Sequence, residues 1–140
     1  MSDHLEVSAT WLGGYESRVS ARTHEITIDE PAAGGGADHG MMPTEAFCAS
    51  IASCYCLALA HVARKRGREL PGLRVVVRAW RPGRELRYER FEIEAQAEVP
   101  DEVLAALIEP ARRVCWVSNT LVEGVELGYT YTSVDGRTPR

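Results

Sequence analysis

Apolar and polar residues alternate along the first part of the chain. The alternation runs over residues 5–11, and the Gly13-Gly14 pair that follows is typical of a β-hairpin turn. It resumes over residues 19–28 and ends at Asp29-Glu30-Pro31, because proline has no N–H to donate to a sheet ladder. The pattern predicts a hairpin followed by further short strands.

A glycine-rich segment and a long helix are expected next. Residues 32–43 contain a run of glycines with no phosphate-loop lysine after it, which indicates a flexible loop rather than an anion site. A helix should begin near Pro43-Thr44-Glu45 and end near Arg66-Gly67. Proline and a carboxylate suit the first turn of a helix, and cations suit its last turn.

The middle of this helix carries no charge. Residues 46–63 contain no Asp, Glu, Lys or Arg, and a stretch of this length reaches the lower limit for crossing a bilayer. The stretch is rich in Ala, Ser and Cys and includes His61, which favours a helix buried on most sides in a soluble core. One small sheet cannot cover such a helix. We therefore expect a homodimer with the helix of residues 44–66 near its interface.

Strand patterns return after the helix. Residues 73–80 and 91–99 alternate in the same way, with a Pro82-Gly83 turn between them. Apolar residues just before the second strand have the opposite parity, which predicts a β-bulge near Glu89-Arg90.

The last third of the chain predicts a helix and a strand. A second helix should open at Pro100-Asp101-Glu102 and bend at Pro110, with Cys115 just past the bend. Residues 135–140 are expected to form a flexible tail. A last strand is predicted from apolar residues of one parity: Val125, Leu127, Tyr129 and Tyr131. Residues 1–140 thus form one domain of the α+β class.

Composition excludes some classes of function. The chain has 16 Lys and Arg residues against 20 Asp and Glu residues, a net charge of −4. Nucleic acids and acidic membranes are bound by concentrated positive charge, so neither partner is expected. Residues 1–6 contain no basic run leading into an apolar segment, hence no secretory signal, and we expect a cytoplasmic protein.

Four cysteines are candidates for chemistry: Cys48, Cys54, Cys56 and Cys115. In a reducing compartment such thiols are inert core residues, metal ligands or redox-active groups. Cys54 and Cys56 point about 200° apart on a helix, so they cannot share a metal ion or bond to each other. His61 is about two turns from Cys54. We expect no metal, and we treat Cys48 and Cys56 as small buried hydrophobic residues.

Three motifs together resemble the OsmC/Ohr family of osmotically inducible and organic-hydroperoxide-resistance proteins. They are the Asp-Glu-Pro and Gly-Gly-x-Asp-x-Gly sequences within residues 29–40, the Ser53-Cys54 pair, and the distant Cys115-Trp116-Val117-Ser118. The resemblance extends from about Val7 to Tyr131. It implies an intertwined α+β homodimer, with antiparallel sheets around a long central helix and no metal or nucleotide cofactor.

The resemblance also implies a reaction. Family members reduce organic hydroperoxides with two cysteines, which match Cys54 and Cys115. Cys54 is then the nucleophile that becomes a sulfenic acid, and Cys115 is the thiol that resolves it as a disulfide. The implied substrate is a small hydrophobic hydroperoxide, and the implied reductant is a dithiol such as a lipoyl group.

The chain departs from the hydroperoxide-reducing branch at two positions. Tyr15 follows the hairpin glycines where that branch has an arginine, and Thr44 stands where it has a carboxylate. A buried thiol is normally protonated, so a cation or hydrogen-bond donors must stabilise the Cys54 thiolate. Arg18, or Arg22 in its place, is our candidate for that cation.

Glu45 is the nearest carboxylate to the position of Thr44. It lies nine residues before Cys54, which is about 13.5 Å along a helix and half a turn out of phase. It therefore acts either across a dimer interface or as an ordinary carboxylate in the first helical turn.

Two functions remain open from the sequence. The first is a thiol peroxidase that uses Cys54 and Cys115. The second is a dimer that keeps the fold but binds a ligand or senses redox state without turnover.

Overall fold

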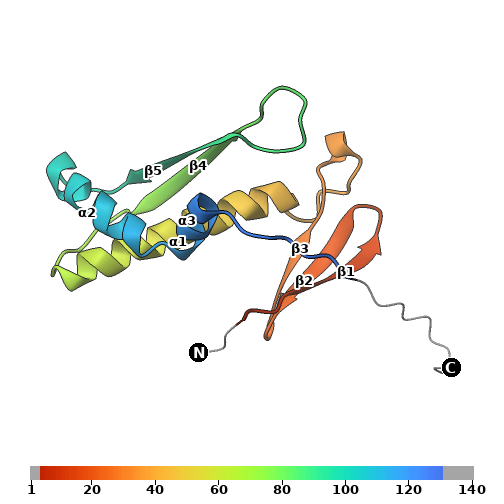
Figure 1. Cartoon of the computed structure of the whole chain (residues 1–140), viewed down its shortest axis with the longest axis horizontal. Helices are drawn as coiled ribbons and strands as arrows, with labels where there is room; N and C mark the ends of the chain where they lie inside the picture. Colours follow the sequence, from red (N-terminus) through yellow and green to blue (C-terminus); the bar gives the residue numbers. More distant parts are fainter. Residues whose placement is uncertain (1–3, 131–140) are drawn as a thin grey trace.

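The computed structural model describes residues 4–130 of the 140. The chain is an α+β fold with two antiparallel sheets and one long helix, which confirms the fold class (Figure 1). The first sheet has the order β1-β2-β3, and its strands are Ser8–Gly13, Glu16–Ala21 and His24–Ile28. Gly13 and Gly14 have φ values of 104° and 56°, which the tight turn between β1 and β2 requires.

The segment after β3 is folded closely against the strand end, not extended as a loose loop. It contains a short 3-10 helix, η1 (Ala32–Gly34), and it returns so that Met41 forms a parallel bridge with Ile28. A side chain at Gly36 would collide with the Glu30 carbonyl, and one at Gly40 with the Thr27 carbonyl. The glycines of the motif therefore allow two backbone segments to touch.

The long helix α1 (Pro43–Lys65) has the predicted ends. The Glu45 carboxylate accepts a hydrogen bond of 2.8 Å from the Met42 N–H at its start. At its end, Gly67 has a φ of 67°, and the Arg68 N–H reaches back to the Ala63 carbonyl at 2.8 Å. This is the Schellman arrangement that glycine favours after a helix.

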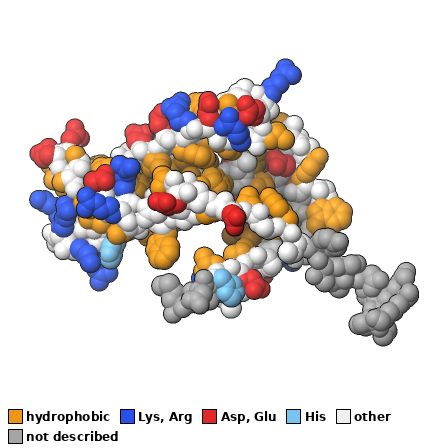
Figure 2. Space-filling view, in the orientation of Figure 1, with side chains coloured by type: hydrophobic (Ala, Val, Ile, Leu, Met, Phe, Trp, Pro, Cys, Tyr) orange, Lys and Arg blue, Asp and Glu red, His pale blue; other side chains and the backbone are white. Residues whose placement is uncertain are grey.

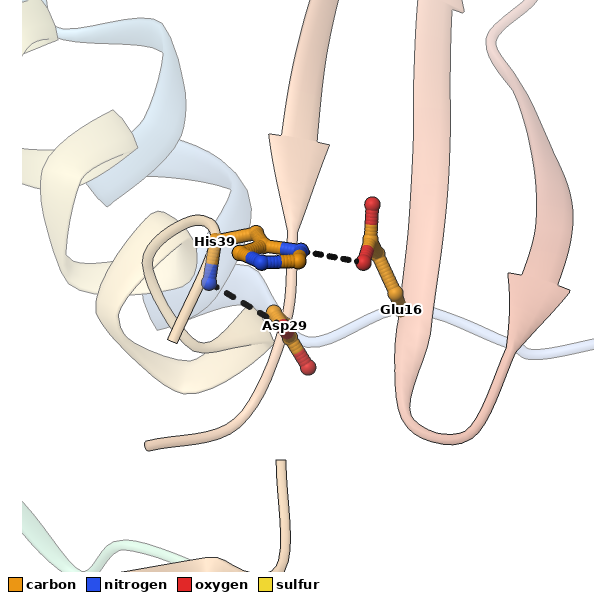
Figure 3. Close-up of side chains that lie close together, drawn as sticks. All are labelled: Glu16, Asp29 and His39. Atoms are coloured by element: carbon orange, nitrogen blue, oxygen red, sulfur yellow. Dashed lines mark hydrogen bonds and ion pairs between the residues drawn. The ribbon is translucent and has the colours of Figure 1, made fainter. Parts of the chain in front are cut away.

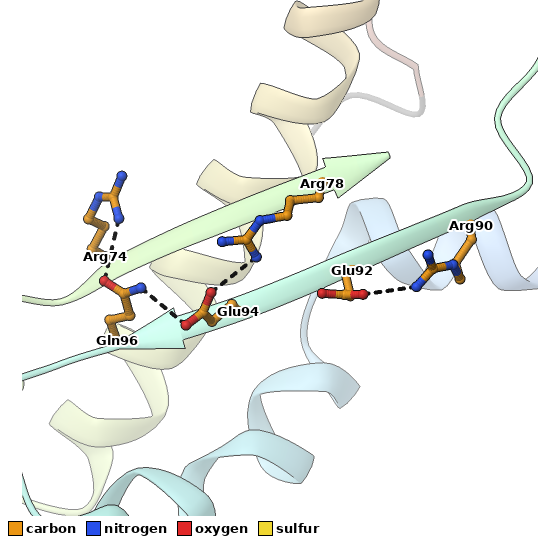
Figure 4. Close-up of polar contacts among 6 residues, drawn as sticks. All are labelled: Arg74, Arg78, Arg90, Glu92, Glu94 and Gln96. Atoms are coloured by element: carbon orange, nitrogen blue, oxygen red, sulfur yellow. Dashed lines mark hydrogen bonds and ion pairs between the residues drawn. The ribbon is translucent and has the colours of Figure 1, made fainter. Parts of the chain in front are cut away.

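The second sheet is a hairpin that lies along α1. Strand β4 (Arg74–Trp80) pairs with β5 (Arg90–Gln96) without a shift of register. Residues 81–89 form a loop. At its end, where the bulge was expected, Arg90 is opposite Trp80 and the Glu89 N–H donates to the Trp80 carbonyl at 2.9 Å, so two successive residues face Trp80. The outer face of the hairpin carries arginine, glutamate and glutamine side chains linked by hydrogen bonds of 2.8–3.4 Å (Figure 4).

Two helices follow the hairpin. Helix α2 (Asp101–Arg113) continues three residues beyond Pro110, and α3 (Trp116–Glu123) begins after Cys115. Residues 125–130 form no strand, which contradicts the prediction for that part, and Tyr131 and the tail of residues 135–140 lie outside the described residues. Alternation makes a segment able to join a sheet, but a strand exists only beside a partner strand, and residues 125–130 have none in the described chain.

The core lies where α1, α2 and the hairpin meet. Hydrophobic side chains fill the hollow beneath the charged hairpin (Figure 2). By length and composition α1 could cross a membrane, but core helices of soluble proteins pass the same test. The buried face of α1 packs into the core, which supports its interpretation as a core helix. The buried residues of α1 are Ile51, Tyr55, Ala58, Leu59, Val62 and Ala63.

Candidate functional site

Cys54 and Cys115 meet in the core. Cys54 lies midway along α1, and Cys115 is the residue between α2 and α3 that caps the start of α3. Cys115 is 0% exposed, whereas Cys54 is half-buried and packs against the cluster to which Cys115 belongs. Cys54 is also among the neighbours that affect the pKa of Cys115, so the two side chains are close together. The fold thus brings together two thiols that are distant in the sequence.

The start of α3 favours negative charge on Cys115. Burial raises the pKa of the Cys115 thiol, but hydrogen bonds outweigh burial and bring the pKa below its ordinary value. The neighbours that lower it are Ser118, Cys54 and Val117, in that order. The first N–H groups of a helix have no partner within the helix, so they are free to stabilise a thiolate there. The pKa of Cys115 is therefore lowered although its side chain is fully buried.

Tyr55 is the next titratable group beside the thiol pair. Burial raises the pKa of the Tyr55 phenol; the charge of Arg112 opposes the change, and Cys115 and Glu109 add to it. Arg112 and Glu109 are themselves an ion pair at 3.0 Å on α2. Tyr55 is accordingly a neutral phenol at neutral pH.

The other two cysteines belong to different surroundings. All four cysteines are free thiols, and Cys48 and Cys56 are half-buried. Burial, with a smaller contribution from Glu45, raises the pKa of the Cys48 thiol. Cys56 lies about 200° around the helix from Cys54. The placement fits the expectation that neither takes part in the thiol pair.

A pocket of about 700 Å³ opens at the N-terminal end of α1. Volumes of this order are usual for small-molecule sites. Its wall is mainly apolar and comes from α1, β5, α3 and the loop of residues 81–89. Among the lining residues are Thr44, Phe47, Arg81, Tyr88, Phe91 and Leu121.

The pocket and the thiol pair lie along the same two helices. Phe47 is seven residues before Cys54 on α1, which is about 10.5 Å along the axis and nearly the same face. Leu121 is six residues after Cys115 on α3, or about 9 Å. Both Phe47 and Leu121 line the pocket, and α1 contacts α3. The distances along the two helices thus both place the pocket roughly 10 Å from the thiols.

Arg18 and Glu45 have other partners within the chain. Arg18 pairs with Glu25 at 3.2 Å on the polar face of the first sheet. Glu45 accepts the Met42 N–H, which is the ordinary role in the first helical turn. Arg22 is exposed in the turn between β2 and β3, with a φ of 55°. None of the interactions found among residues 4–130 joins these side chains to Cys54.

Glu16, Asp29 and His39 form a second polar cluster (Figure 3). Asp29 is 1% exposed, and its two carboxylate oxygens accept three N–H groups, from Glu30, Ala37 and His39, at 2.7–3.2 Å. Led by the bond from the His39 N–H, these donors lower the pKa of Asp29 against the effect of burial. The carboxylate of Asp29 therefore holds the glycine-rich segment in place.

The same cluster has the residue types of a metal site. The ligand atoms lie within 4.8 Å of one another. However, the oxygens of Asp29 face three N–H groups, whose positive ends disfavour a cation. The His39 ring is hydrogen-bonded to Glu16 at 2.7 Å. The cluster is satisfied by internal hydrogen bonds and does not fit a metal ion.

Several residues of the site were not identified from the sequence. Ser118 follows Cys115 by three residues at a helix start, a spacing at which a side chain returns to the first residue. Tyr55 directly follows Cys54 and gave no distinct signal. The buried role of Asp29 depends on the path of residues 30–40, which the sequence does not specify.

Comparison with known proteins was made at the level of family and fold. The family model described as OsmC-like protein matches residues 35–130. Comparison with curated protein sequences gave no match. Solved structures are similar over most of their length. An OsmC-like protein of Mycoplasma pneumoniae is 16% identical with a TM-score of 0.73, covering 89% of this chain and 91% of that one.

Two further structures exceed a quarter sequence identity. One is an organic hydroperoxide resistance protein from Elizabethkingia anophelis, 26% identical with a TM-score of 0.63, covering 85% of this chain and 88% of that one. The other, from Vibrio cholerae, is classed with the same proteins and has captopril bound in one of its active sites. It is 27% identical with a TM-score of 0.65, and covers 85% of each chain.

Proposed function

The chain belongs to the OsmC-like protein family, and we propose that it reduces organic hydroperoxides with Cys54 and Cys115 as the reacting thiols. The observation that carries the proposal is the proximity of these two thiols, one half-buried and one fully buried, from distant parts of the sequence. The hydroperoxide resistance proteins with similar folds support the reaction class.

The reaction requires one nucleophilic and one resolving thiol. The Cys54 sulfur attacks a peroxide oxygen, the O–O bond breaks, and an alcohol leaves after taking up a proton. Cys54 is then a sulfenic acid. The Cys115 sulfur attacks the Cys54 sulfur, water leaves, and a disulfide remains. A dithiol such as a lipoyl group reduces the disulfide and becomes a disulfide itself.

The pocket supports an organic substrate. Its apolar wall, with Phe47 and Phe91 rings 5.7 Å apart, suits the hydrocarbon part of a hydroperoxide. Its distance of about 10 Å from the thiols matches a substrate that reaches from the pocket to Cys54. Hydrogen peroxide has no group to occupy the pocket and should react more slowly.

The proposal includes a second copy of the chain. Arg18 and Glu45 can act at Cys54 only from a partner subunit, because within one chain they are bound to Glu25 and Met42. We propose a cytoplasmic homodimer, with no nucleic-acid or membrane partner.

Peroxide consumption by the purified protein tests the function. Cumene hydroperoxide and hydrogen peroxide are supplied in turn, with dihydrolipoamide as reductant. The wild type should consume cumene hydroperoxide catalytically and faster than hydrogen peroxide. Cys54→Ser should abolish turnover, and Cys56→Ser, the matched control on the same helix, should retain it. Peptide mapping after substoichiometric peroxide should find the Cys54–Cys115 disulfide, and a dominant link through Cys56 would refute the assignment.

A second function is favoured by the residues that depart from the family pattern. Tyr15 and Thr44 replace an arginine and a carboxylate, and a sensing or ligand-binding dimer needs neither. Oxidation of Cys54 by a single equivalent of peroxide, without turnover in excess dithiol, would identify that function.

A further inference from the structure

The pocket at the start of α1 has charged side chains that the proposed reaction does not use. Its lining includes Arg81 and Arg87, and none of the described residues that line it is Asp or Glu. Both arginines come from the loop of residues 81–89, which lies over the first turns of α1 (Figure 1). A guanidinium stays positively charged in a protein. The pocket therefore combines an apolar wall with one positively charged side.

We propose that this pocket binds a small amphipathic carboxylate, with its acid group at Arg81 and Arg87 and its apolar body against the aromatic rings. That such a compound is the hydroperoxide substrate rests on the proposed function. Binding of the acid itself concerns only the pocket and applies whether or not peroxide is reduced.

The loop holds the guanidinium of Arg81 in place. Its Nε donates to the Glu85 carbonyl and its Nη2 to the Arg84 carbonyl, each at 3.1 Å. These bonds use two of the five guanidinium N–H groups, and both acceptors are neutral. No ion pair found within residues 4–130 joins Arg81 to a carboxylate. The charge of Arg81 is therefore fixed in position, with donors left for an acid in the pocket.

Arg87 already has a carboxylate as its partner at the edge of the pocket. Its Nε lies 2.7 Å from the Glu85 carboxylate, and the two side chains are 56% and 59% exposed. An ion pair this exposed contributes little free energy. Glu85 does not line the pocket. A carboxylate inside the pocket can therefore compete with Glu85 for Arg87, because a guanidinium matches the two oxygens of a carboxylate.

The remaining wall accepts an apolar body. The ring centroids of Phe47 and Phe91 are 5.7 Å apart, and those of Tyr88 and Phe91 are 5.9 Å apart, so the three rings form one continuous surface. Leu86 also lines the pocket and is 98% exposed. A ligand that covers this apolar surface removes it from water, which favours binding.

The two sides of the pocket also set the direction of the ligand. The arginines belong to the loop, whereas Phe47 and Leu121, which line the pocket from α1 and α3, are apolar. These two helices lead from the pocket to Cys54 and Cys115. An acid bound at the loop therefore directs its apolar end toward the thiols, as a substrate of the proposed reaction requires.

Binding of one acid and its neutral analogue tests the inference without peroxide. The probes are phenylbutyrate and phenylbutanol, which share the ring and the carbon chain and differ in the acid group. In calorimetric titration of the reduced full-length protein, the Kd of the acid should be lower than that of the alcohol by about tenfold. Equal affinities for the two probes would overturn the inference.

Arg87→Gln and Arg84→Gln are a matched pair from the same loop. Each removes one positive charge from an exposed arginine, but only Arg87 lines the pocket. Arg87→Gln should raise the Kd of phenylbutyrate about fivefold and leave that of phenylbutanol unchanged, and Arg84→Gln should change neither. An equal loss in both variants would show attraction by the overall charge of the loop and would overturn the inference.

Glu85→Gln distinguishes binding from a structural role of the loop. It removes the carboxylate that competes for Arg87 and keeps the backbone carbonyl that holds Arg81. Phenylbutyrate should bind about threefold more tightly, a gain that damage to the loop would not produce. Unchanged or weaker binding would show that Arg87 does not receive the acid and would overturn the inference. If the acid binds as expected but peroxide is not consumed, the carboxylate site is supported and the proposed peroxidase function fails.

Discussion

The two regions of the molecule bury their apolar residues to different extents. Where α1, α2 and the hairpin β4–β5 meet, Leu59 is 0% and Leu107 1% exposed. In the sheet β1-β2-β3, Trp11 is 74% and Ile26 54% exposed, although both lie on the apolar face of the sheet. The first region completes its core within one chain. The second presents an apolar face that another surface must cover, which supports the proposed homodimer.

The largest effect on stability is expected in the core where α1, α2 and the hairpin β4–β5 meet. Leu59→Ala should lower the free energy of unfolding by about 2–5 kcal/mol, because it removes buried methyl groups and leaves a cavity. Urea denaturation at fixed protein concentration measures the change. Leu57→Ala, at an exposed position of the same helix, is the control and should change it much less. Equal effects would show that the exposed side of α1 is covered as fully as its core side.

Substitutions on the apolar face of the sheet β1-β2-β3 should weaken dimer formation rather than folding. We expect the wild type to be a dimer by light scattering at low micromolar concentration. Ile26→Asp should weaken the dimer at least about tenfold, since it places a charge on the apolar face. Thr10→Asp, on the polar face of the same sheet, should leave the mass unchanged. A monomeric wild type with a cooperative thermal transition would contradict the dimer.

Asp29 joins the end of the sheet to the glycine-rich segment, and its replacement tests that junction. Asp29→Asn places an amide NH₂ against N–H donors and should lower the Tm by roughly 5 °C. Because the pKa of Asp29 is lowered in the fold, its contribution is present above the ordinary carboxylate pKa and is lost on acidification. Asp38→Asn is the control, since Asp38 is exposed and asparagine tolerates its φ of 59°. A similar Tm for the two variants would show that Asp29 does not hold the segment.

The smallest effect is expected at His39. Its hydrogen bond to Glu16, with the charge of Glu16, raises the pKa of the imidazole above 6.5. The contribution to stability is therefore complete below pH 6.5 and is lost as pH rises through the folded-state value. The pair is exposed, so the Tm should fall by only about 1 °C across this range. Glu16→Gln should remove the pH dependence; if it does not, another group is titrating.

Local patterns predicted most of the fold. The ends of α1 follow from Pro43, Glu45 and Gly67, and the turn between β1 and β2 follows from the Gly13-Gly14 pair. The prediction of a last strand was wrong over residues 125–130. Alternation shows that a segment can form a strand, but it does not show whether a partner strand lies beside it.

The candidate site was predictable only in part. The family motifs led to Cys54 and Cys115, and the fold brings these residues together. Arg18 has the parity of Ser20 and not of Val19, so its place on the polar face could have been derived from the alternation. The surroundings of Cys115 arise from the junction of α2 and α3, which depends on tertiary packing.

The contact of α1 with the junction of α2 and α3 has a consequence for the unfolded chain. A disulfide between Cys54 and Cys115 closes a loop of about sixty residues, and a link of that span removes enough disorder from the unfolded ensemble to stabilise a fold by about 4 kcal/mol. During each turnover of the proposed reaction, the chain then passes through one form with this disulfide and one form without it. The oxidised protein should resist denaturant and proteases better than the reduced one. The redox state of the two thiols therefore also determines how long the chain stays folded.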